Sequence, residues 1–78
     1  MLSKREIEVL RLLAKGYTMH QIAQKLSITY HMTRTHVSSM LKKLDMISQV
    51  HLVIWAHKTR LVTLSEINFG RETAEGQP

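Results

Sequence analysis

The chain has 78 residues, of which 44% are hydrophobic, so it is long enough for one small domain and too apolar for a disordered protein. It has no cysteine, which excludes disulfides and thiolate metal sites, and no apolar run near the roughly 20 residues that a membrane span needs. The formal net charge is +5, and residues 1–62 alone carry +7, because they hold ten lysine and arginine residues and three acids. This basic body predicts an anionic partner: nucleic acid, an anionic membrane or an acidic protein.

The first two helices are predicted from their start signals. Ser3 can cap a helix whose third residue is Glu6, the pattern of a capping box, and Gly16 suits the end of that helix. Thr18 and Gln21 repeat the capping pattern at the start of a second helix. Apolar residues recur between these signals with the period of about 3.6 that marks a helix with one buried face.

Two more helices are predicted downstream. The second helix stops near Ser27, and Thr29 can cap a third helix that runs to about Leu44. Ser48 can cap a fourth helix, which continues through His57 or the next residue. The only proline lies at the end of the chain, so no proline kinks these helices.

The C-terminal segment has a different composition. Leu61 and Val62 are expected to fold back on the core, which sets the predicted domain at residues 1–62. Residues 63–78 are acidic, contain two glycines and a proline, and have few apolar side chains. We expect them to form a largely disordered C-terminal tail.

Residues 18–44 have the arrangement of a helix-turn-helix. Two helices are separated by about three residues, which forces them to cross steeply and requires a small residue such as Ala23 at their contact. A helix-turn-helix predicts DNA binding, but a simple helical hairpin has the same pattern.

The third predicted helix carries two different faces. One face is apolar and is expected to join the core: Thr33, Val37, Met40, Leu41 and Leu44. The other face is polar: His31, Arg34, Thr35, Ser38 and Lys42. Arginine, serine and threonine are side chains that contact base edges, and lysine suits phosphates. The alternative is a solvated surface, but such a surface usually mixes acids with bases, and this face has no acid.

Several segments together resemble one family. They are "LSKREIEVLRLLAKG", "IAQKLSI", "THVSSMLKKL" and the closing "RLV". Residues 2–62 thus resemble the LuxR/FixJ-type (GerE-like) DNA-binding domain of bacterial transcription regulators, and "HVSSMLKKL" and "VIWAH" are most similar to its NarL-like response-regulator branch. The resemblance implies an all-α fold of four helices, with the third helix in the major groove and the fourth used for dimerisation.

The resemblance also assigns site residues. The base-contacting positions fall on Arg34, Thr35 and Ser38. The phosphate-contacting positions fall near Thr18, His20, Tyr30 and Lys42. His31 and Lys43, beside them on the third helix, are also expected to contact the DNA backbone.

Departures from the family pattern affect what the chain would recognise. Tyr30 and His31 replace a common acidic-polar pair and are the expected source of a distinct site preference. Thr33 places a hydroxyl where the family is usually apolar, which is costly unless that hydroxyl bonds a carbonyl one turn back. Ser38 is shorter than the lysine frequent in the NarL-like branch, so it need not make the same contact.

The fourth predicted helix is apolar on more than one side. Leu52, Val53 and Ala56 form a stripe that should face the core. A second stripe is the predicted dimer interface: Val50, Ile54 and His57. The alternative is that these are scattered surface residues with no partner.

The sequence offers no chemistry beyond binding. The histidine spacings do not match a zinc site, and there is no phosphate-binding glycine loop, carboxylate pair or catalytic triad. We therefore expect no enzyme activity, cofactor, metal or small-molecule ligand, and no membrane contact.

The predicted partners are double-stranded DNA, a second copy of the chain on DNA, and RNA polymerase, in the bacterial cytoplasm. The alternative function is a helix-turn-helix protein-interaction module that pairs with another regulator through the fourth helix without binding DNA. Whether the domain acts alone or is part of a larger regulator is left open.

Overall fold

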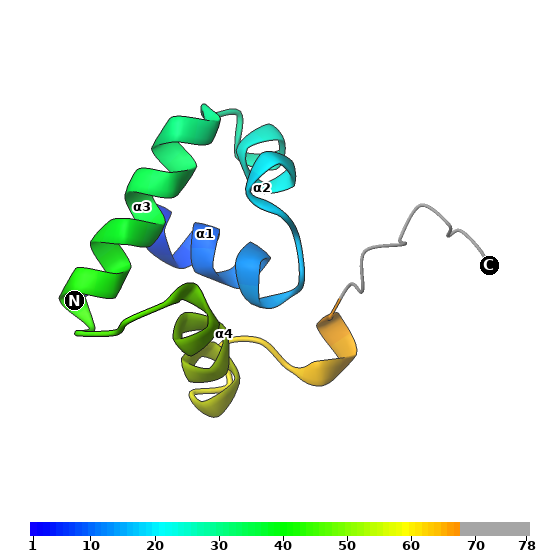
Figure 1. The fold of residues 1–78 in the computed structure, drawn as a ribbon. Coiled ribbons are helices and arrows are strands. Elements are labelled where there is room, and N and C mark those ends of the chain that lie inside the picture. Colours follow the sequence, from blue (N-terminus) through cyan, green and yellow to red (C-terminus); the bar gives the residue numbers. More distant parts are fainter. Residues whose placement is uncertain (68–78) are drawn as a thin grey trace.

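The computed structural model describes residues 1–67, which form four α-helices and one short 3-10 helix and contain no strand (Figure 1). The elements are α1 (Lys4–Ala14), α2 (Met19–Leu26), α3 (Tyr30–Lys43), α4 (Gln49–Lys58) and η1 (Leu64–Glu66). Helices α1 and α3 each contact all three of the other α-helices, so together they form the centre of the domain. The predicted all-α, four-helix fold is confirmed. Within residues 1–67, no helix is both long enough and apolar enough to cross a bilayer.

Three of the predicted helix caps are present. The Glu6 backbone N–H donates to the Ser3 hydroxyl over 3.1 Å, and the Ser3 N–H donates to the Glu6 carboxylate over 2.8 Å. Thr18 and Gln21 form the same reciprocal pair at the start of α2. The Thr29 hydroxyl accepts from the third backbone N–H of α3 over 2.9 Å. These bonds satisfy N–H groups that have no partner inside the helix, and so they fix where each helix begins.

The turn between α2 and α3 has three residues, as predicted. Ser27 ends α2 in a left-handed conformation, with φ of 56°. The Ile28 N–H donates to the Ala23 carbonyl over 3.0 Å, which closes the turn. Ala23 is buried, and its small side chain lets the two helices approach closely. The helix-turn-helix is therefore formed by residues 18–44.

The core lies between α1 and the other helices. Its buried apolar residues are Val9, Leu10, Leu13, Ala14, Ile22, Ala23, Val37, Met40, Leu52, Ala56 and Val62. Thr33 is fully buried among them, and its hydroxyl donates to the Thr29 carbonyl one turn back over 3.0 Å. This is the bond that a buried hydroxyl at this position requires. Leu61 is half-buried against the core and Val62 is buried, so the predicted fold-back of the chain is also confirmed.

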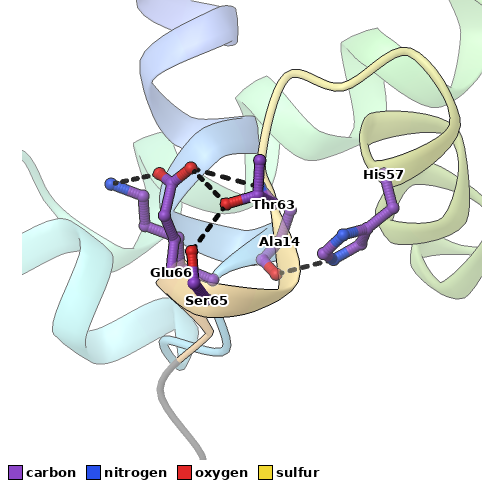
Figure 2. Close-up of polar contacts among 6 residues, drawn as sticks. Ala14, His57, Thr63, Ser65 and Glu66 are labelled. Atoms are coloured by element: carbon purple, nitrogen blue, oxygen red, sulfur yellow. Dashed lines mark hydrogen bonds and ion pairs between the residues drawn. The ribbon is translucent and has the colours of Figure 1, made fainter.

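Residues 63–67, the start of the predicted tail, contain the short helix η1. The Glu66 carboxylate accepts from the Thr63 N–H over 3.1 Å and from its hydroxyl over 3.0 Å (Figure 2). These bonds lower the pKa of Glu66, and the carboxylate also lies 3.6 Å from the Lys15 ammonium at the end of α1. The remainder of the predicted tail, residues 68–78, lies outside the described residues.

A buried carboxylate joins the start of α1 to the end of α3. Glu6 is only 4% exposed, and besides the Ser3 N–H it accepts from the Ser39 hydroxyl over 2.6 Å and from the Lys43 ammonium over 2.9 Å. Burial alone would raise the pKa of Glu6, but the bonds from Ser39, Lys43 and Ser3 outweigh it and lower the pKa to about 2. We call these four residues the Glu6 cluster; it fixes α3 against α1.

Removing the charge of Glu6 should destabilise the domain. Glu6→Gln keeps the side chain's size but weakens its bonds to Ser39 and Lys43, and we expect a loss of about 2 kcal/mol in the free energy of unfolding at pH 7. The folded pKa of about 2 lies below the ordinary 4.5, so the ionised carboxylate stabilises the fold above pH 4.5. This stabilisation disappears as the pH falls from 4.5 towards 2. Urea denaturation between pH 2 and 7 should show that fall in the parent but not in the variant.

The control is Glu8→Gln on the same helix. Glu8 pairs with Arg5 over 3.0 Å, but both side chains are more than 40% exposed. An exposed pair of this kind contributes little, so the control should lose less than about 0.5 kcal/mol. Equal stabilities and equal pH profiles for the two variants would show that the Glu6 cluster does not stabilise the fold.

Candidate nucleic-acid interface

The polar face of α3 lies on the surface of the domain. The exposed residues of this outer face of α3 are His31, Arg34, Thr35, Ser38 and Lys42. Thr35, Ser38 and Lys42, with Ser39 and Lys43 beside them, line a shallow groove of about 440 Å³. The opposite side of the same helix is in the core through Val37 and Met40. Burial of one side thus holds the other side towards solvent.

The outer face of α3 has cations that lack an acidic partner within the described residues. The ion pairs found between residues 1 and 67 join Arg5 to Glu8, Lys15 to Glu66 and Lys43 to Glu6. Neither Arg34 nor Lys42 takes part in them. Because no acid occurs between Glu8 and Asp45 in the sequence, this region has a single sign of charge. Such a surface attracts a polyanion.

Aromatic rings lie where α2 and α3 begin. The rings of His20 and Tyr30 are stacked, with centroids 4.2 Å apart and planes at 18° to each other. The Arg34 guanidinium carbon is 5.9 Å from the centre of the Tyr30 ring, one turn further along α3. Sequence reasoning placed these three side chains on one surface but did not predict that they touch.

Several predicted site residues have partners inside the chain. The Lys43 ammonium is bonded to Glu6, and its side chain is 40% exposed. The Thr18 hydroxyl accepts the cap bond of α2. The Thr35 hydroxyl donates to the His31 carbonyl over 3.0 Å, which leaves its lone pairs and its methyl group for an outside contact. Lys43 therefore has a structural partner that the sequence did not reveal.

Gln49 was missed by the sequence analysis. It is the first residue of α4 and lies on a groove of about 390 Å³ beside α3. The other residues that line this groove are Met19, Tyr30, Arg34, Val37, Ser38 and Leu41. No local pattern could have found Gln49, because its place depends on how residues 44–48 lead the chain from α3 into α4.

Helix α4 has the two predicted stripes, with one correction. Leu52 and Ala56 are fully buried, whereas Val50 is 61% and Ile54 51% exposed. His57 does not continue the exposed stripe, because its Nε2 lies 3.2 Å from the Ala14 carbonyl oxygen at the end of α1 (Figure 2). That carbonyl has no partner within its own helix, so the imidazole satisfies it. The exposed α4 stripe therefore consists of Val50 and Ile54.

The histidines are spread over the domain. His20 stacks on Tyr30, His51 is 3.1 Å from the Ser48 hydroxyl, and His57 contacts α1. Ser48 was expected to cap α4 with this hydroxyl, but the bond to His51 replaces a bond to the backbone. In the described part of the chain, no three histidine or acidic side chains lie close enough together to hold a metal ion.

Comparison with known proteins agrees with this geometry. Residues 1–56 match the family model described as "Bacterial regulatory proteins, luxR family". The chain belongs to the luxR family. It is 39% identical over 61 residues to the transcriptional regulatory protein LiaR of Bacillus subtilis, an alignment that covers 78% of the chain and 29% of LiaR. It is 42% identical over 62 residues to the response regulator protein VraR of Staphylococcus aureus, which covers 80% of the chain and 30% of VraR.

These relatives confirm the resemblance to the LuxR/NarL type of regulator. The luxR-family match and the four-helix fold make the chain a DNA-binding helix-turn-helix domain of bacterial transcription regulators. The chain spans less than a third of the length of the relatives it matches.

Proposed function

We propose that this luxR-family domain binds double-stranded DNA sequence-specifically by inserting α3 into the major groove. The observation that carries the proposal is the outer face of α3, which exposes Arg34, Thr35, Ser38 and Lys42 and includes no acid. An α-helix fits the major groove of B-DNA, where each base pair presents a distinct pattern of donors and acceptors. The fixed position of α3 against α1 supports entry of the helix as a rigid element.

The base contacts come from the middle of α3, between Arg34 and Ser38. Arg34 has no acidic partner within residues 1–67 and can donate two parallel bonds to guanine O6 and N7. Ser38 lies one turn further along and can donate or accept. The Thr35 hydroxyl already donates its hydrogen bond to the His31 carbonyl, so Thr35 offers its methyl group to thymine or its oxygen as an acceptor to a base amino group.

The backbone contacts surround this face. Lys42 is exposed two turns after Arg34 and suits a phosphate. Thr18 and His31 are exposed at the starts of α2 and α3, and they stay predicted contacts to the DNA backbone. His20 and Tyr30 are predicted for the same role from the sequence, but their rings stack on each other, so we leave them out of the backbone contacts. We leave Lys43 out of the phosphate contacts because its ammonium is bonded to Glu6.

Two copies would bind together through α4. Val50 and Ile54 are large apolar residues that remain exposed on a helix whose other side fills the core. A symmetric contact between two such stripes would place the α3 helices about one turn of DNA apart. The area offered by two side chains is small, so we expect the dimer to form on DNA. The exposed α4 stripe also suits the alternative function, in which the domain pairs with another regulator through α4 without binding DNA.

Replacing Arg34 and replacing Lys42 should change DNA binding in different ways. Arg34→Ala should cost about 1–3 kcal/mol on the best site and much less on random duplex DNA, because a base contact is lost. Lys42→Ala should weaken binding to all sequences alike and reduce the slope of log affinity against log salt by about one per half-site. The measurement is a salt series for both variants, on a duplex selected from a random library and on a random duplex.

Lys43→Ala is the matched control for Lys42→Ala. It removes the same charge from the neighbouring residue, but it should lower the melting temperature and change the salt slope less. If the Arg34 variant weakens on both duplexes equally, Arg34 binds phosphate and does not recognise a base. If the parent domain binds no duplex with a steep dependence on salt, the protein-interaction function replaces DNA binding.

The exposed α4 stripe should control cooperative binding. Ile54→Glu and Ile54→Lys both place a charge in the apolar contact, so both should abolish cooperativity on a duplex with two half-sites. On a single half-site the lysine variant should bind at least as well as the parent, which separates the interface from the effect of charge. His57→Ala should instead cost about 1 kcal/mol of stability and leave cooperativity intact. Binding curves on both duplexes test this, and unchanged cooperativity in both Ile54 variants would place the interface elsewhere.

A further inference from the structure

The aromatic pair, His20 and Tyr30, joins the two helices of the helix-turn-helix at its exposed end. His20 is the second residue of α2 and Tyr30 the first residue of α3, so the stack bridges the starts of the two helices. The centroid distance of 4.2 Å and the angle of 18° describe face-to-face contact. Both side chains are on the surface, and Tyr30 is 39% exposed. Stacking on His20 restricts the rotation of the Tyr30 ring without burying it.

Tyr30 also contacts the residue proposed to recognise a base. Residues four apart lie on the same side of a helix, and the Arg34 guanidinium carbon is 5.9 Å from the Tyr30 ring centre. That distance is within the range of a cation–π interaction. Arg34 and Tyr30 also line the same groove beside Ser38, so the ring borders the space that the guanidinium can occupy.

An exposed arginine normally samples many rotamers. Fixing it on a ligand costs conformational entropy, and a surface that restricts the arginine beforehand lowers that cost. The ring that restricts Arg34 is itself held by His20. Contacts therefore run from His20 through Tyr30 to Arg34.

We propose that His20 and Tyr30 are positioning residues that hold the Arg34 guanidinium for its base contact and thereby set sequence preference. This rests on the proposed function, and it gives the aromatic pair a role other than binding phosphate. The role depends on the aromatic rings and not on the Tyr30 hydroxyl or the His20 nitrogens. The effect of either residue must also pass through Arg34.

Phenylalanine and leucine substitutions separate the two roles. Tyr30→Phe and His20→Phe keep a ring that can stack but remove the polar groups that a phosphate would bind. Tyr30→Leu and His20→Leu keep apolar volume but remove the ring. On the preferred duplex we expect the phenylalanine variants to bind like the parent and the leucine variants to bind about three- to tenfold more weakly. On random duplex DNA all four should bind like the parent, with unchanged salt slopes.

A double-mutant cycle tests whether the effect passes through Arg34. In an Arg34→Ala background, Tyr30→Leu and His20→Leu should cause no further loss on the preferred duplex. A further three- to tenfold loss there that is not matched on random duplex DNA would overturn the proposal. A folding defect is recognised separately, because it would weaken binding to both duplexes.

The other outcomes are also distinct. Phenylalanine variants that weaken binding to both duplexes and reduce the salt slope would assign the pair to phosphate contacts and overturn positioning. Leucine variants that bind the preferred duplex as tightly as the parent would also overturn positioning. Failure of the parent to prefer any duplex would instead overturn the proposed function on which this inference rests.

Discussion

The carboxylate of Glu6 determines how α3 is held against α1. A buried carboxylate is costly unless it is fully bonded, and Glu6 meets this condition by accepting from Ser3, Ser39 and Lys43. Two of these donors lie on the last turns of α3, more than 30 residues away in sequence. The group that caps α1 therefore also fixes the end of α3, while the Thr33 hydroxyl and the three-residue turn fix its start.

The same cluster shapes the charge of the surface. Lys43 is bonded to Glu6, whereas Lys42, about 100° around the helix, is exposed with Arg34 on the outer face. Glu6 is mostly buried, so its negative charge is paired inside the domain and does not offset the outer face. The ion pair between Glu6 and Lys43 thus stabilises the packing of α3 and leaves the outer face of α3 with positive charge only. In the proposed function, this rigid basic surface meets the major groove.

The local features of the fold could be predicted from sequence, whereas several features of the site could not. Helix boundaries, the caps at Ser3 and Thr18 and the buried Thr33 follow from residues within one turn of each other. The bonds of Glu6 to α3, the His20–Tyr30 stack and the contact of His57 with Ala14 join different helices, so no spacing rule indicates them. His57 illustrates the limit: helical periodicity put it on the exposed stripe, but the unsatisfied carbonyl at the end of α1 supplied a nearer partner.

The central claim is that the outer face of α3 is the surface that meets DNA. The most direct measurement is a titration of the ¹⁵N-labelled domain with a duplex selected from a random library, followed by amide chemical shifts. The account predicts that the largest changes cover residues 30–42 and the start of α2, with the Arg34 side-chain Nε–H signal among them. With a duplex that holds one half-site, it predicts much smaller changes around the half-buried Trp55, which lines a pocket with Leu2 and Ile7 at the start of α1. Changes confined to residues 47–58, with α3 unaffected, would contradict the account and support a protein-interaction module that acts through α4.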